Sequence, residues 1–163
     1  MNNLMSNVLA EKVLKSPNAP TVVQIIQQAL ALEATNRHNF REWIDEGMKA
    51  EFINGEIVVH SPVKKKHWQA SDFLSTLLSV YTKIKKLGTT GVEKVLIALT
   101  RNDYEPDIVF FKNDKAVLFT KDRMFFPAPD FVVEILSNKT ASKDKGIKKT
   151  RLCGAWCSRI LDY

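Results

Sequence analysis

Two strongly apolar, strand-like runs each carry one carboxylate, and this pattern constrains the fold more than any other feature of the sequence. Phe131–Leu136 reads FVVEIL, with Glu134 as its one charged residue, and a second run, DIVFF, begins at Asp107 directly after Pro106. Burying an ionised carboxylate is costly unless a partner or a metal ion compensates the charge. Two such acids on neighbouring strands are the sequence pattern of a divalent-metal site.

Each acid also has a simpler interpretation. Asp107, taken alone, could equally be a strand-start residue that bonds to local backbone groups. Glu134 could be paired with a buried lysine or arginine, although structural ion pairs seldom lie in the middle of so apolar a strand. Taken together, the two residues favour a functional site.

Length and composition set the class of protein. A chain of 163 residues, 45% hydrophobic, can form one domain with a sizeable core. There is no apolar stretch of about 18 residues to span a membrane and no signal-peptide pattern, so we expect a soluble, cytoplasmic protein. The net charge of +6 comes mostly from lysine clusters at 64–66, 83–86 and 139–149. These clusters fit a solvated surface or a polyanion-binding one.

The two cysteines do not indicate a zinc site. Cys153 and Cys157 are spaced as a helical i, i+4 pair, but the nearest histidine in the sequence is His67. Structural zinc needs about four ligands at recognisable spacings. We therefore expect no zinc.

The hydrophobic pattern predicts an α/β fold built on a mixed β-sheet. Asn54-Gly55 predicts a hairpin turn, and Gly88 is expected to end a long helix. The expected helices are 21–33, a short turn at 39–47, a long helix around 73–84, and a last helix from Ser142 or Asp144. The expected strands are the hairpin at 51–60, then 92–99, 107–111, 116–119 and 131–136.

Five motifs in order resemble a known family. EFINGE, SPVKKKH, EPDIVFF, PAPDFVVEILS and TASKDKGIKK closely resemble the Uma2-like family of restriction-endonuclease-fold proteins over residues 36–150. The resemblance implies a PD-(D/E)xK nuclease core, a mixed β-sheet flanked by helices, after a helical extension at 1–35. It also implies an endonuclease that uses Mg²⁺ or Mn²⁺ and acts on nucleic acid, with DNA as the expected substrate. A homodimer would suit an enzyme that cuts both strands. Non-catalytic binding of nucleic acid and a non-functional fragment are the alternatives.

The resemblance also assigns roles to residues. Asp107 and Glu134 match the metal-binding catalytic acids, Glu51 matches a third metal ligand, and Lys148 matches the catalytic cation. The lysine of the motif is absent from its usual place, where Leu136 stands. His67 has either a helix-start role or a supporting one near the phosphate. The supporting residues are His67, Asp130 and Asp144.

The tail after Thr150 departs from the family. It reads RLCGAWCSRILDY at 151–163, whereas permitted codons for these residues, read one base later, encode DYAAHGVAEYWI, which resembles the family continuation. We therefore hypothesise a frameshift that removes the last core strand. Such a loss would leave an unpaired sheet edge and weaken the placement of Lys148. It would leave this chain's own catalysis in doubt.

Overall fold

The computed structural model describes residues 8–135, and the chain divides into two compact units after Trp43. The first unit contains α1 (Val8–Leu14) and α2 (Ala19–Trp43). The helix expected at 21–33 and the helical turn expected from 39 belong to this one longer helix. None of the helices within residues 8–135 has the length and apolarity needed to cross a membrane.

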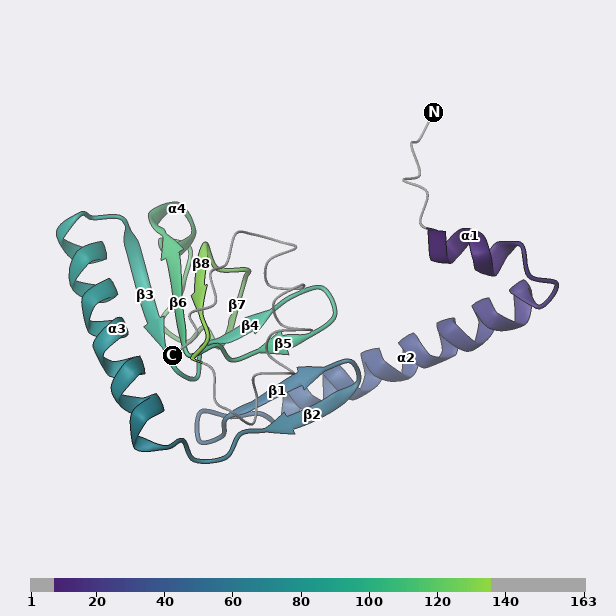
Figure 1. Cartoon of the computed structure of the whole chain (residues 1–163), viewed down its shortest axis with the longest axis horizontal. Helices are drawn as coiled ribbons and strands as arrows, with labels where there is room; N and C mark the ends of the chain where they lie inside the picture. Colours follow the sequence, from purple (N-terminus) through teal and green to yellow (C-terminus); the bar gives the residue numbers. More distant parts are fainter. Residues whose placement is uncertain (1–7, 136–163) are drawn as a thin grey trace. The chain divides into compact units, whose positions relative to one another are not determined.

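The second unit is a mixed α/β structure, as predicted (Figure 1). Its strands form a five-stranded sheet in the order β2-β1-β5-β4-β7 and a three-stranded sheet in the order β3-β6-β8. Among the described strands, β4 and β7 pair in parallel and the other pairs are antiparallel. The elements are β1 (Ala50–Ile53), β2 (Glu56–Val59), α3 (Lys65–Ile84), β3 (Gly88–Val92), β4 (Leu96–Ala98), β5 (Asp103–Tyr104), β6 (Ile108–Lys112), α4 (Asn113–Ala116), β7 (Phe125–Phe126) and β8 (Phe131–Val133).

The hairpin predicted at residues 51–60 is present as β1 and β2. Its turn residues Asn54 and Gly55 have φ values of 53° and 90°. A two-residue turn with positive φ at both positions matches the twist of the flanking strands, and Asn-Gly adopts it at low cost. The turn fixes the register, with Ile53 opposite Glu56 and Glu51 opposite Val58.

The central strand β6 has apolar residues on both faces, and each face packs against a different layer. Ile108 belongs to a core cluster with Val133 and Ile135, against which Leu74 and Leu78 of α3 pack. The alternate residues of β6 pack against the strands of the five-stranded sheet, in a cluster of Val109, Phe111, Ile97, Tyr104 and Val132. The period of two therefore places β6 between α3 and the other sheet.

The strand expected at 116–119 is wrong, because α4 covers Asn113–Ala116 and no strand follows it before β7. Ala116 and Phe119 both pack on the core, whereas Val117 and Leu118 are 77% and 70% exposed. An i, i+3 pair of inward residues is the spacing of a helical turn, not of a strand. A short apolar run without alternation does not distinguish the two.

Two further boundaries differ from the sequence prediction. The long helix α3 ends at Ile84, because Lys86 adopts φ 52° and the Leu87 N–H donates to the carbonyl of Thr82 at 2.9 Å. That is a helix-ending turn made without glycine, and Gly88 instead begins β3. The strand expected at 92–99 is interrupted where Glu93 and Lys94 have positive φ, so that β3 and β4 lie in different sheets.

Candidate active site

Glu105-Pro106-Asp107 connects the two sheets, and this connection positions the site. β5 ends at Tyr104 in the five-stranded sheet, and β6 starts at Ile108 in the three-stranded sheet. Pro106 has no N–H to donate to a ladder, so the chain can leave one sheet and enter the other here. Asp107 is anchored by its carbonyl, which accepts the Glu93 N–H at 3.0 Å, and it is 6% exposed.

Asp107 and Glu134 lie at the same end of neighbouring strands. The antiparallel register pairs Ile108 with Val133, and its continuation by one residue sets Asp107 opposite Glu134. Residues directly opposite each other in an antiparallel pair project from the same face. The Ile135 N–H donates to Oδ2 of Asp107 at 2.8 Å, which draws the two chain segments together. Both acids are buried, at 6% and 7% exposure.

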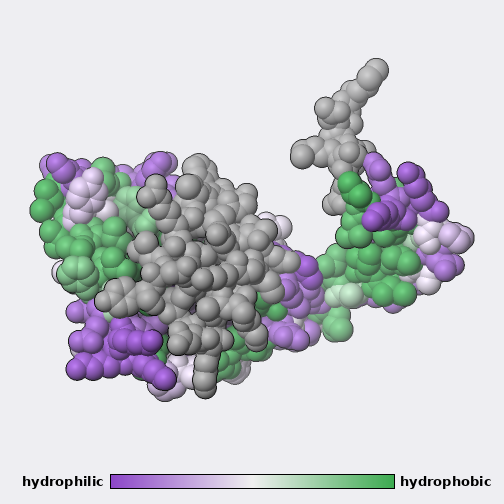
Figure 2. Space-filling view, in the orientation of Figure 1, coloured by the Kyte–Doolittle hydropathy of each residue, from purple (hydrophilic) through white to green (hydrophobic). Residues whose placement is uncertain are grey.

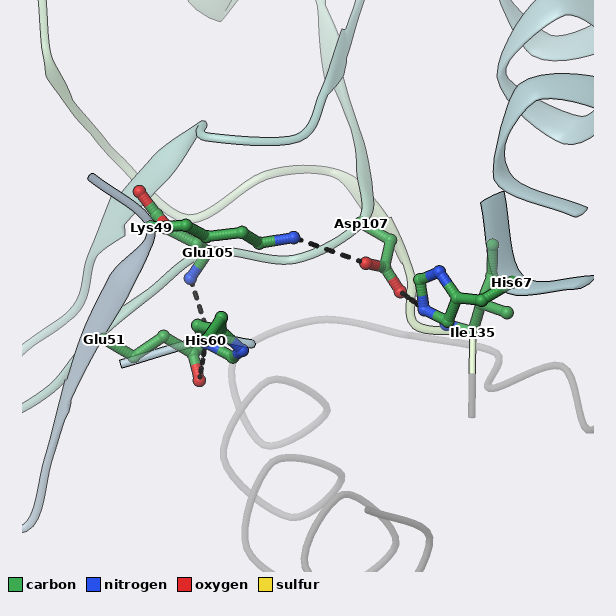
Figure 3. Close-up of polar contacts among 7 residues, drawn as sticks. All are labelled: Lys49, Glu51, His60, His67, Glu105, Asp107 and Ile135. Atoms are coloured by element: carbon green, nitrogen blue, oxygen red, sulfur yellow. Dashed lines mark hydrogen bonds and ion pairs between the residues drawn. The ribbon is translucent and has the colours of Figure 1, made fainter. Parts of the chain in front are cut away.

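A lysine and a histidine approach Asp107 from different elements (Figure 3). Nζ of Lys49, just before β1, is 3.8 Å from Oδ1 of Asp107. Nε2 of His67, in the first turn of α3, is 3.3 Å from Oδ2. Nδ1 of His67 is buried and has no hydrogen-bond partner among the described residues. His67 therefore contacts the carboxylate directly, and its supporting role near the phosphate stays a prediction.

Glu51 lies in β1 and is 1% exposed. Its Oε1 accepts the Glu105 N–H at 2.9 Å, and its Oε2 is 3.2 Å from Nε2 of His60 (Figure 3). The His60 contact is within ion-pair range but lacks the alignment of a hydrogen bond. These contacts fasten Glu105 to β1, and the expected role of Glu51 as a third metal ligand stays a prediction.

Glu105 is a further buried acid that sequence reasoning left without a role. It is 4% exposed, and its Oε2 has no hydrogen-bond partner among the described residues. Burial raises the pKa of Glu105 above its ordinary value, although the positive charges of Lys49 and His60 act against the rise. The sequence signal that could have pointed to Glu105 is its position two residues before Asp107, on the other side of Pro106. No sequence signal linked Lys49 to Asp107.

The remaining expected site residues are not gathered here. Asp130 lies at the far end of the β6–β8 ladder, where its carboxylate accepts the Lys112 N–H at 2.9 Å and contacts Lys115 at 3.1 Å. The structure does not bring Asp130 to Asp107, because the antiparallel register separates residue 130 from residue 107 by the length of β6. Lys148 and Asp144 lie outside the described residues.

A basic surface adjoins His67. Lys64 is the N-cap residue of α3, and it, Lys65 and Lys66 are exposed. Figure 2 shows hydrophilic side chains gathered over the N-terminal end of α3, with hydrophobic ones farther along this helix. The exposed lysine cluster at 64–66 directly precedes His67, which contacts Asp107, so its positive charge lies close to the candidate site.

The oxygen donors at this point suit a hard divalent cation, although they do not form a complete protein cage. No group of three or more His, Cys, Asp or Glu side chains within residues 8–135 is arranged to hold a metal ion. Mg²⁺ is usually bound by one or two carboxylates and completes its shell with water and substrate phosphate. The buried pair Asp107 and Glu134, with the unpartnered oxygen of Glu105 nearby in the chain, fits that pattern.

Comparison with known proteins identifies the family and supports the fold. The model of the Uma2 family, described as "Putative restriction endonuclease", matches residues 37–153. A solved structure entitled a "putative nuclease belonging to DUF820" from Anabaena variabilis is similar, with a TM-score of 0.65 and 16% sequence identity. The similarity covers 76% of this chain and 71% of that one. No curated protein matches the chain.

Proposed function

Because the chain belongs to the Uma2 family, we propose that it is a divalent-metal-dependent endonuclease that hydrolyses phosphodiester bonds in DNA. One observation carries the proposal: two buried acids, Asp107 and Glu134, lie opposite each other at one end of neighbouring strands, and Lys49 and His67 contact the first of them.

Asp107 and Glu134 would hold the ion, Mg²⁺ or Mn²⁺, through carboxylate oxygens. When bound, the ion neutralises charge on the phosphate and lowers the pKa of a bound water. The protein keeps these oxygens in place through the Ile135 N–H and the contact with His67, both at Oδ2 of Asp107. Such outer contacts orient metal-binding carboxylates and are important to metal affinity.

The reaction is a hydrolysis and needs no other reactant than water. The water oxygen forms a bond to phosphorus, the ester P–O bond breaks, and the departing oxygen takes a proton to become a hydroxyl end. The product strand keeps the phosphate as a monoester. The exposed cluster Lys64–Lys66 lies beside His67 and supplies positive charge for the DNA phosphates on either side of the cleaved bond.

DNA binding without hydrolysis is the second candidate. It is favoured by the contacts of Asp107 with Lys49 and His67, which already balance its charge, and by the absence of a three-ligand group within residues 8–135. In this case the lysine surface would carry the function alone. The two candidates make opposite predictions for Asp107, because a binding protein does not need an acid facing the phosphate.

A cleavage assay distinguishes them. Wild-type protein with Mg²⁺ or Mn²⁺ is incubated with plasmid and with single-stranded oligonucleotides, with EDTA as the metal-free arm. We expect metal-dependent cleavage that Asp107→Asn strongly reduces and that Asp114→Asn retains, since Asp114 is an exposed acid of α4 whose carboxylate accepts the N–H of the adjacent Lys115. DNA binding without cleavage by wild-type protein would instead establish the second candidate. Sedimentation of the same samples tests the expected homodimer, and fractionation of cells tests the cytoplasmic location.

A further inference from the structure

Among residues 8–135, Lys49 faces Asp107 with an ammonium group that has donors to spare. Its Nζ lies 3.8 Å from Oδ1 of Asp107, which is within ion-pair range and beyond hydrogen-bond range. Within residues 8–135 its ammonium donates no hydrogen bond, and an ammonium has three donors. The side chain is 21% exposed, so solvent and ligand reach it.

Other lysines of the same unit show what an engaged ammonium looks like. Nζ of Lys94 donates to the carbonyls of Glu46 and Gly47 at 3.0 and 3.4 Å. Nζ of Lys115 donates to the Ala128 carbonyl at 2.9 Å and to Asp130 at 3.1 Å. Both ammonium groups hold the fold together through short contacts. Lys49 differs, since it stands beside a buried acid without bonding to it.

The backbone at Lys49 is fixed although the ammonium is not. The His60 N–H donates to the Lys49 carbonyl at 3.0 Å, which extends the β1–β2 ladder by one residue. The next residue, Ala50, is 0% exposed. Lys49 therefore points at Asp107 from a rigid strand end, on the side of the carboxylate away from His67 (Figure 3).

We propose that Lys49 is a catalytic residue, whose ammonium contacts a non-bridging oxygen of the cleaved phosphate and stabilises the negative charge that develops there. The proposal rests on the proposed function. A compact positive charge is what the transition state of phosphate hydrolysis requires at this position. The sequence places Leu136, not lysine, two residues after Glu134. Lys49 supplies this charge from upstream of both acids.

Substitution of Lys49 tests the role of the charge. Lys49→Met should lower kcat by about 100- to 1,000-fold, the usual effect of removing one transition-state donor, with DNA affinity in EDTA nearly unchanged. Lys49→Arg should recover part of the loss, and ethylammonium ion should restore part of the activity of Lys49→Ala. Lys94→Met is the matched control that removes a structural lysine.

The possible results are distinct. Wild-type activity in Lys49→Met, together with an inactive Asp107→Asn, would overturn the role of Lys49 and leave the proposed function intact. A loss that neither arginine nor ethylammonium reverses, accompanied by a lowered Tm, would make Lys49 structural and also overturn it. An inactive wild-type protein would overturn both proposals.

Discussion

Asp107 and Asp130 stand at opposite ends of the same ladder, β6 with β8, and have similar partners. Each accepts one backbone N–H, from Ile135 at 2.8 Å and from Lys112 at 2.9 Å respectively. Each also faces a lysine. At Asp130 the lysine bonds at 3.1 Å, whereas at Asp107 it stops at 3.8 Å and a histidine joins it.

We propose that this difference distinguishes a structural acid, Asp130, from a catalytic one, Asp107. Asp130 has its charge satisfied by short contacts, and the amide of Lys112 together with Lys115 lowers its pKa below the ordinary value although burial acts to raise it. Asp107 has a longer contact with its lysine, and in the proposed function a metal ion shares this carboxylate. The two side chains are similarly buried, at 9% and 6% exposure, so the length of the lysine contact is what distinguishes them.

The largest expected effect is on cleavage. Asp107→Asn should lower kcat/KM by about 100- to 1,000-fold, in the range that electrostatic groups contribute at active sites. Asp130→Asn should leave it close to the wild-type value, because the register places Asp130 at the far end of β6. Rates of plasmid nicking, measured side by side for the two variants and the wild type, test both expectations. Equal losses in the two variants would erase the distinction between the two ends of the ladder.

The next effect is on stability. Asp130→Asn should lower the free energy of unfolding by about 1 kcal/mol at neutral pH, since a charge-assisted hydrogen bond becomes a neutral one. The pKa of Asp130 is lowered on folding, so its contribution is present above its ordinary value of 3.8 and is lost as pH falls through the folded-state pKa. Urea unfolding at several pH values measures this. A deficit that persists in acid would contradict it.

The last effect concerns Glu105, two residues before Asp107. Burial raises the pKa of Glu105, so the protonated acid favours folding below its ordinary value of 4.5, and this contribution is lost as pH rises through the higher folded-state pKa. Glu105→Gln stays neutral at all pH values. Its stability relative to wild type should therefore increase from acid to neutral pH, by about 1.4 kcal/mol for each unit of pKa shift. A stability difference between Glu105→Gln and wild type that does not change with pH would contradict a raised pKa of Glu105 in the folded protein.

Local sequence signals were sufficient for some elements and insufficient for others. The hairpin at Asn54-Gly55 follows from backbone sterics alone, and the structure has it where the sequence predicts it. The run at 116–119 was misassigned because four apolar residues suit a helical turn as well as a strand. Asp107 and Asp130 both precede a strand in the sequence. Because β6 and β8 are antiparallel, the start of β8 lies beside the end of β6, and Asp130 is therefore far from Asp107.

The amino-acid order by itself determined the α/β class, the hairpin, and the presence of two acids in apolar strands, because propensity, turn chemistry and the cost of burying charge act over short stretches of chain. Tertiary structure alone decided which polar groups meet. Lys49 reaches Asp107 across 58 residues of sequence, because β1 and the Glu105–Asp107 connection belong to neighbouring strands of one fold. Such a contact depends on strand order and register, which no local pattern encodes.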